Sequence, residues 1–112
     1  MSVRRGEIIR VNLNPTSGRE QAGNARPCLV LSHTQYNMKR QGIVIVTPIT
    51  NTVKPEVKIM VEIPSGFKVK GSVIAEQVKT IDLKKRWWRT TDEILPTDFV
   101  DLVVQVFAVI IG

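Results

Sequence analysis

A charged stretch between Asn14 and Pro27 combines residue types that can bind an anion and move a proton. Arg19 and Arg26 carry planar cations with several donors, and Glu20 is a carboxylate that can accept a proton. The rest of the stretch is rich in proline, glycine and asparagine, which predicts a long exposed loop. Loops of this length inside compact proteins are often functional, although the composition is equally compatible with a solvated linker between strands.

Two apolar segments flank this loop and are predicted to be strands. Residues 6–13 contain β-branched residues in partial alternation, and residues 27–32 are almost continuously apolar. An apolar run of this kind is typical of a strand that is buried on both faces. Cys28 lies within it and is the one cysteine of the chain. We therefore expect Cys28 to be a small core residue rather than a nucleophile, and no intrachain disulfide.

The strongest strand signal is the segment 42–50, Gly-Ile-Val-Ile-Val-Thr-Pro-Ile-Thr. Pro48 lacks the amide hydrogen of a ladder bond, so the strand is expected to leave the sheet or bulge there. Thr50 would then stand at the exit of the strand, where its hydroxyl can face an open site. The remaining expected elements are a short helical turn at 33–40, a strand at 57–63, one or two short strands at 71–81, and loops at 51–56 and 64–70.

Residues 83–90 form a basic and aromatic cluster, Leu-Lys-Lys-Arg-Trp-Trp-Arg-Thr. Arginine beside tryptophan suits stacking on unpaired bases together with neutralisation of phosphates. Strand alternation would send Trp87 and Trp88 to opposite faces, so we expect at least one of them to face the core instead.

The last segment, from Leu95 onwards, is predicted to be a helix in spite of its many β-branched residues. Its polar residues Asp98, Asp101 and Gln105 are three and four positions apart, which makes one narrow stripe of a helix. The rest of the circumference is apolar, more than a small barrel is expected to cover. We therefore expect the helix to bury part of its surface against a second copy, in a homodimer.

The charge of the chain is strongly asymmetric. All 16 Lys and Arg residues lie at or before Arg89, whereas four of the ten Asp and Glu residues follow it. Residues 1–90 therefore carry a net charge of +10 and the tail a charge of −4. A basic body of this kind favours contacts with phosphates, so nucleic acid is the expected partner class, against the alternative of a charged surface that only aids solubility.

Composition limits the class of protein further. The chain has 112 residues, of which 43% are hydrophobic and 23% charged, as in ordinary globular proteins. It is long enough for one domain, 1–112, with a modest core. No apolar run is long enough to span a membrane, and no signal peptide is recognisable, so the cytoplasm is the expected location. Several short strands and one terminal helix predict a small barrel-like fold of the α+β class.

The ordered series of motifs resembles the MazF/PemK/Kid group of toxin endoribonucleases over almost the whole chain. The resemblance is carried by Arg-Gly-Glu-Ile at 5–8, Asn-Pro-Thr-Ser-Gly-Arg-Glu-Gln-Ala-Gly at 14–23, Arg-Pro at 26–27, Tyr-Asn at 36–37, Thr-Pro-Ile-Thr at 47–50 and Glu-Gln-Val-Lys-Thr-Ile-Asp at 76–82. It implies an SH3-like β-barrel with a C-terminal helix, as in CcdB and PemK, working as a homodimer. It also implies a cognate antitoxin whose acidic segment covers the basic site.

The activity that the resemblance implies is cleavage of single-stranded RNA, including mRNA, at preferred sequences without a metal or other cofactor. The 2′-hydroxyl attacks the adjacent phosphorus and leaves a 2′,3′-cyclic phosphate and a 5′-hydroxyl. Glu20 matches the proposed base, Arg26 the essential arginine, and Thr50 a hydroxyl that binds the scissile phosphate. Glu76 matches an acidic position that is either structural or in contact with a base. Substrate contacts are accordingly expected from Arg19, Gln21, Lys54, Glu76, Gln77 and Lys79.

Two other functions remain compatible with the same fold. A CcdB-like gyrase poison acts through a C-terminal tip that contains tryptophan, whereas this chain ends in Val-Ile-Ile-Gly at 109–112. A non-catalytic RNA-binding barrel would share the basic body and would bind RNA in a salt-dependent manner without turnover.

Overall fold

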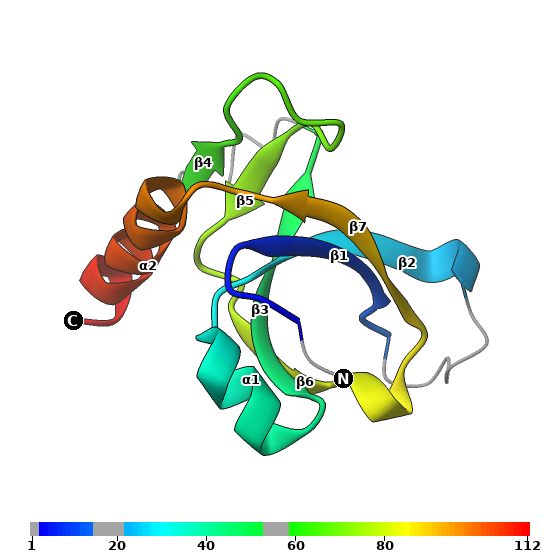
Figure 1. The fold of residues 1–112 in the computed structure, drawn as a ribbon. Helices are drawn as coiled ribbons and strands as arrows, with labels where there is room; N and C mark the ends of the chain where they lie inside the picture. Colours follow the sequence, from blue (N-terminus) through cyan, green and yellow to red (C-terminus); the bar gives the residue numbers. More distant parts are fainter. Residues whose placement is uncertain (1–2, 15–21, 53–58) are drawn as a thin grey trace.

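The protein folds into a curled antiparallel β-sheet with one long helix beside it (Figure 1). The computed structural model describes residues 3–14, 22–52 and 59–112. The elements are the strands β1 Glu7–Asn12, β2 Ala25–Val30, β3 Ile43–Thr50, β4 Met60–Glu62, β5 Ser72–Ile74, β6 Lys79–Asp82 and β7 Trp88–Ile94, the 3₁₀ turns η1 Ala22–Asn24 and η2 Leu83–Lys85, and the helices α1 Thr34–Arg40 and α2 Thr97–Ile111.

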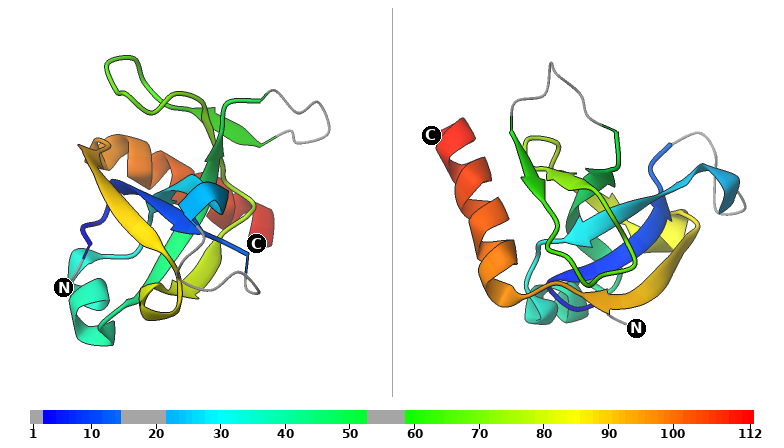
Figure 2. Two further views of the ribbon diagram at one scale, coloured as in Figure 1. Left: turned by 90° about the vertical axis from the view of Figure 1, so that its right-hand side faces the viewer. Right: turned by 90° about the horizontal axis from the view of Figure 1, so that it is seen from above.

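The strands pair in the order β4-β5-β3-β2-β1-β7, and β6 pairs with β3 beside this path. Every pairing is antiparallel. The views in Figure 2 show the sheet bending round on itself, with α2 along one side. The predicted class, a small barrel-like α+β fold with a C-terminal helix, is therefore confirmed.

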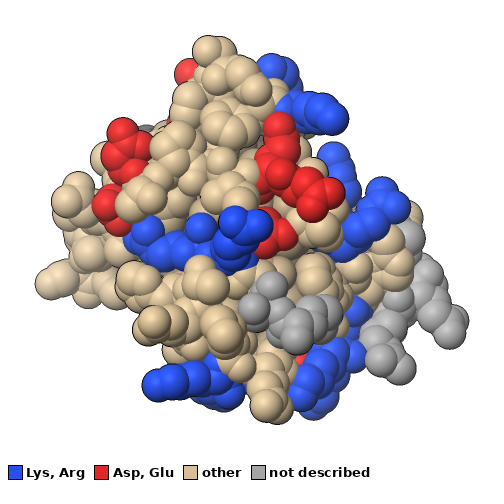
Figure 3. All heavy atoms as spheres, in the orientation of Figure 1, with Lys and Arg blue, Asp and Glu red and all other residues tan. Residues whose placement is uncertain are grey.

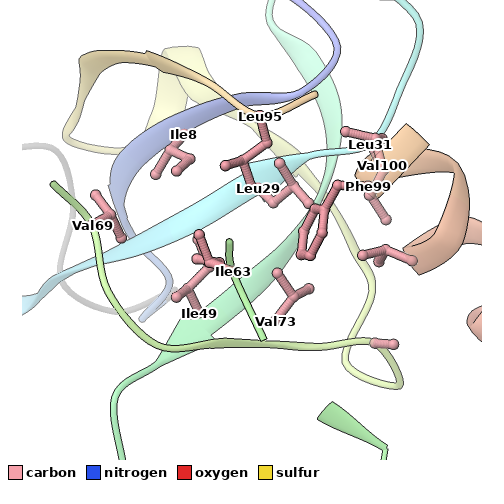
Figure 4. Packing of buried hydrophobic residues seen from close by; sticks show 12 residues of the cluster. Ile8, Leu29, Leu31, Ile49, Ile63, Val69, Val73, Leu95, Phe99 and Val100 are labelled. Carbon is pink, nitrogen blue, oxygen red and sulfur yellow. The ribbon is translucent and has the colours of Figure 1, made fainter. Parts of the chain in front are cut away.

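Both faces of β2 are buried in its second half, Cys28 to Val30, as the continuous apolar sequence predicted. Leu29 faces a first core cluster, and Cys28 and Val30 face a second one. The first cluster, drawn in Figure 4, contains Ile8, Leu29, Leu31, Ile49, Ile63, Val69, Val73, Ala75, Leu95, Phe99, Val100 and Val103. The second contains Val3, Ile9, Val11, Cys28, Val30, Val44, Val46, Ile81 and Leu83. Alternate side chains thus fix β2 between two apolar layers.

The prediction that β3 leaves the sheet or bulges at Pro48 was wrong. β3 continues to Thr50, and Pro48 is paired with Cys28 of β2. The other edge of β3 is bonded to β6 as far as Val46 and to β5 from Ile49 onwards. Pro48 therefore lies where that ladder is already interrupted, a position that tolerates a missing amide hydrogen.

The C-terminal helix α2 has the predicted arrangement. Its Phe99, Val100 and Val103 are buried in the first core cluster, and the predicted polar stripe is exposed. The helix begins after Pro96, with Asp98 in its positive first turn. From Leu102 onwards the helix exposes apolar side chains, namely Leu102, Val104, Val109, Ile110 and Ile111. No helix in the described ranges is long and apolar enough to cross a membrane.

The shorter predicted elements are confirmed with shifted bounds. The helical turn is α1, and the segment 71–81 forms the two strands β5 and β6. In the segment 57–63, β4 begins at Met60, and residues 57–58 lie outside the described ranges. Trp88 is partly buried against the second core cluster, which confirms that at least one tryptophan faces the core.

Candidate active site

Arg26 projects from a strand and not, as expected, from the end of a long loop. β2 begins at Ala25, which is paired with Asn12 of β1, and Arg26 is paired with Val11. The guanidinium of Arg26 is exposed, and within the described part of the chain it has no ion-pair or hydrogen-bond partner. A cation that is fixed at its base by a sheet and exposed at its tip is suited to bind a phosphate.

A cleft with a volume of about 340 Å³ opens beside Arg26 and is called here the Arg26 cleft. Its described lining consists of Arg10, Arg26, Pro27, Ile49, Asn51, Lys68, Val69 and Lys70. Four of these residues are cations, and no carboxylate is among them. In Figure 3, several groups of Lys and Arg atoms lie along the right-hand side of the face that is shown, with Asp and Glu atoms beside the upper ones. Such a concentration of one sign of charge attracts a polyanion.

Thr50 lies at the end of β3, between two residues that line the Arg26 cleft, Ile49 and Asn51. Its hydroxyl accepts a hydrogen bond from the amide of Thr52 at 3.1 Å. A Cβ built on Gly71 would approach the carbonyl oxygen of Thr50 to 2.2 Å, and Gly71 has a φ of +127°. Only glycine allows the two backbones this approach, so Gly71 sets the position of Thr50.

The loop at 64–70 is attached to β7 by Glu93. The carboxylate of Glu93 accepts hydrogen bonds from the amides of Lys68, at 2.7 Å, and Val69, at 3.0 Å. These bonds hold the pKa of Glu93 below its ordinary value. Val69 is buried in the first core cluster, while Lys68 and Lys70 on either side of it are exposed. The loop therefore holds two lysines over the cleft.

The predicted contact residues Glu76, Gln77 and Lys79 lie at the turn between β5 and β6 and at the start of β6. Glu76 and Lys79 are exposed. None of the three is among the described lining of the Arg26 cleft.

Burial raises the pKa of the Cys28 thiol to about 12, although the nearby positive charges of Lys79 and Arg26 act to lower it. Both cations thus lie within electrostatic reach of Cys28, which is a core residue as predicted.

Four predicted site residues lie outside the described residues, namely Arg19, Glu20, Gln21 and Lys54. Sequence reasoning, in turn, did not select Arg10, Lys68 and Lys70, which line the cleft. Arg10 interrupts the apolar sequence of β1, and the two lysines alternate with buried Val69. A charged residue inside an otherwise apolar strand is the sequence feature that could have identified Arg10 as a site residue. In the described ranges no three His, Cys, Asp or Glu side chains gather in a way that could hold a metal ion.

Comparisons with known proteins agree over nearly the whole chain. The endoribonuclease toxin MazF of Escherichia coli K12 is 35% identical over 109 residues, which cover 96% of this chain and 92% of that protein. A crystal structure of MazF from Deinococcus radiodurans superimposes with a TM-score of 0.81 at 28% identity, covering 100% of this chain and 98% of that one. A MazE–MazF complex from the same organism has the same fold, with a TM-score of 0.80 at 24% identity, 100% of this chain and 97% of that one being covered. Residues 4–111 match the family model of PemK-like, MazF-like toxins of type II toxin–antitoxin systems, and the chain belongs to this family.

Proposed function

We propose that this chain is a toxin endoribonuclease that cleaves single-stranded RNA, mRNA included, at preferred sequences. Its MazF relative is named an endoribonuclease and covers almost all of the chain. The observation that carries the proposal is the exposed Arg26 guanidinium, which has no partner among the described residues and stands in a cleft with three further cations. A cleft of this charge suits a phosphodiester backbone better than a neutral substrate.

The proposed reaction uses the substrate's own 2′-hydroxyl as the nucleophile. Its oxygen bonds to the adjacent phosphorus as its proton passes to a base. The bond from phosphorus to the 5′-oxygen breaks, and that oxygen takes up a proton. The products are a 2′,3′-cyclic phosphate and a 5′-hydroxyl. This chemistry needs no metal ion, provided that cationic donors stabilise the charge on the phosphorane.

The roles follow from side-chain chemistry and from the family resemblance. Arg26 stabilises the charge that develops on the phosphate, a role that suits a permanently charged, multidentate donor. Glu20, six residues earlier in the chain, is proposed as the base, and the Thr50 hydroxyl as a donor to the scissile phosphate. The remaining contacts to RNA are assigned by the same proposal to Arg19, Gln21, Lys54, Glu76, Gln77 and Lys79.

Two protein partners belong to the same proposal. The apolar side chains that α2 exposes would be covered in a homodimer, since an unpaired apolar helix face is unfavourable in water. The MazE–MazF complex of Deinococcus radiodurans supports a cognate antitoxin for this chain as well. An acidic antitoxin segment would complement the basic cleft and block access of RNA. A chain of this function, 1–112 forming one toxin domain, is expected in the cytoplasm, where mRNA is found.

Cleavage of a single-stranded RNA in the presence of EDTA tests the proposal directly. We expect products that end in 2′,3′-cyclic phosphate, and a loss of roughly 10²–10³ in kcat for Arg26→Ala, as for removal of one transition-state donor. Lys39→Ala on α1, which removes an exposed charge elsewhere, serves as the control and should cleave like the parent. Equal rates for the parent and Arg26→Ala would refute the role of Arg26, and the absence of any cleavage by the parent would refute the function.

A further inference from the structure

A second cleft adjoins the Arg26 cleft on the side of β7 and is called here the Arg89 cleft. Its volume is about 490 Å³, and its lining includes Arg10, Lys68, Arg89, Thr90, Asp92 and Glu93. Arg10, Lys68 and Val69 line both clefts. The two hollows therefore share a wall, and a chain molecule lying in one can continue into the other.

Strand register places the cations of the second cleft side by side. Arg10 of β1 is paired with Arg89 of β7 on one edge and with Pro27 of β2 on the other. Directly opposite residues of an antiparallel pair point to the same face, with their Cβ atoms about 5 Å apart. Both arginines are exposed. Arg26 is paired with Val11 and so leaves β2 on the opposite face from Arg10 and Arg89, but Arg10 lines the Arg26 cleft as well and so connects the cations of the two clefts.

The wall of the Arg89 cleft contains a β-bulge. Ile8 of β1 is paired with Glu93, whereas the next residue, Ile9, is paired with Thr90, so Thr91 and Asp92 are extra residues. Asp92 has a φ of 62°, in the left-handed region that non-glycine residues seldom adopt. Bulges re-aim a side chain out of the ladder, and strained backbone of this kind is concentrated at functional sites.

Two threonines hold the bulge in place. The Thr90 hydroxyl accepts a hydrogen bond from the amide of Asp92 at 3.0 Å. The Thr91 hydroxyl accepts one from the amide of Glu93 at 3.2 Å and donates one to the carbonyl of Ile8 at 2.6 Å. The position of Asp92 is therefore fixed from both sides.

The two carboxylates of this wall have different roles. Glu93 is engaged by the amides of Lys68 and Val69, and it holds the loop at 64–70. The Asp92 carboxylate is exposed. An exposed acceptor in a cleft that is also lined by cations suits a ligand that has both phosphates and amino groups, as an RNA strand does. Carboxylates accept hydrogen bonds from exocyclic amino groups of bases, which only unpaired RNA offers freely.

We propose that the Arg89 cleft binds the RNA strand that flanks the scissile position. Arg89 and Arg10 contact its phosphates, and Asp92 accepts a hydrogen bond from the amino group of one unpaired base. The inference rests on the proposed endoribonuclease function and adds a subsite to it. It makes the cleft a determinant of both substrate length and sequence preference.

The test compares two oligoribonucleotides around one mapped cleavage site. The short one carries the site and its immediate neighbours, and the long one is extended on both sides. We expect Arg89→Gln to lower kcat/KM on the long RNA by roughly two- to fivefold, the range of one exposed charge contact, with a smaller loss on the short RNA. The slope of log kcat/KM against log salt on the long RNA should become shallower by about 0.7, the value for one single-strand phosphate contact. Arg89→Lys should keep the parental slope, and Lys39→Gln should match the parent on both substrates.

Asp92→Asn tests the base contact separately, because asparagine tolerates the left-handed conformation and keeps the bulge. On a library with randomised flanks, we expect its selectivity at one flanking position to shift away from bases with an amino group. Equal losses for Arg89→Gln on the two substrates, a parental salt slope, or an unchanged flank preference in Asp92→Asn would each overturn the inference. Cleavage of the short RNA by the parent, and its loss in Arg26→Ala, reports on the proposed function independently.

Discussion

Gly71 joins the fold to the candidate site, and its replacement by alanine gives a prediction that can be worked out from the structure. The alanine Cβ would lie 2.2 Å from the Thr50 carbonyl oxygen, whereas real Cβ contacts are essentially never shorter than 3.0 Å. Backbone atoms line this contact, so no flexible side chain can turn away. β5 and the end of β3 must therefore separate by at least the missing 0.8 Å.

The cost of this separation has two parts. A residue with a Cβ at a φ of +127° is strained by about 1–3 kcal/mol. β3 and β5 are joined only at the pairs Ile49↔Val73 and Thr50↔Ser72. Moving the two strands apart by this amount would stretch the backbone hydrogen bonds between them beyond hydrogen-bond distance. Loss of these bonds adds about 1 kcal/mol each. We expect Gly71→Ala to lower the free energy of unfolding by about 3–5 kcal/mol, a large fraction of the stability of a typical domain.

Gly66 provides a matched control, because it has a φ of +102° but no neighbouring atom within 4 Å of the position that an added Cβ would take. Gly66→Ala should therefore show the conformational strain without the clash. The measurement is urea unfolding of both variants, followed by RNA cleavage at a temperature where each is folded. Gly71→Ala should lose more stability than Gly66→Ala, and should also cleave RNA more slowly, since Thr50 is displaced. Equal urea midpoints for Gly71→Ala and Gly66→Ala would refute the argument that the close approach of Gly71 to Thr50 makes the difference.

Two further predictions concern titratable groups. The pKa of Glu93 is lower in the folded protein, so its hydrogen bonds stabilise the loop at 64–70 when the pH is above 4.5, the ordinary pKa, and are lost as the pH falls through the lowered pKa. The amide NMR shifts of Lys68 and Val69 should therefore titrate with a midpoint below pH 4.5, and Glu93→Gln should abolish this titration. A midpoint at or above pH 4.5 would contradict the assignment. The pKa of the Cys28 thiol is about 12, so only about 10⁻⁴ of the thiol groups are ionised at pH 8, and the side chain is buried. A thiol reagent should therefore label Cys28 only as fast as the protein unfolds. Rapid labelling of the native protein would contradict this prediction, since it would show that the thiol is accessible.

The sequence predicted those parts of the fold in which the local order of apolar and polar residues matches the burial of the same residues. Residues 27–32 are apolar on both faces because β2 lies between two core clusters. The polar stripe of the C-terminal helix was readable because three side chains at helical spacing face solvent. At Pro48 the same kind of reasoning was wrong. Proline removes one backbone hydrogen bond from a sheet, which is why a break was expected at Pro48. The sequence of β3 does not reveal that its neighbour changes from β6 to β5 at this point, so that the missing hydrogen bond is tolerated.

The candidate site was less predictable, because pairing of distant strands assembles it. Arg10 and Arg89 stand side by side only because the first strand of the chain pairs with the last. No local pattern links two residues so far apart in sequence. Arg26 was recognised, but it was expected in a loop, since its apolar partner Val11 belongs to another segment. Side-chain chemistry therefore identified Arg26, whereas its place in a strand opposite Val11 depends on strand pairing.

The segment from Lys68 to Gly71 connects these observations, since each of its residues has a separate structural or electrostatic role. Val69 packs in the first core cluster, the amides of Lys68 and Val69 are bonded to Glu93, and Gly71 lies against Thr50. Lys68 and Lys70 thus have their backbones fixed while their ammonium groups remain exposed. Fixing the backbone before RNA arrives reduces the ordering entropy that binding would otherwise cost. The affinity of the cleft should therefore depend on the packing of Val69 as well as on the charge of the two lysines. Loss of that packing would weaken RNA binding even though the net charge of the protein stayed the same.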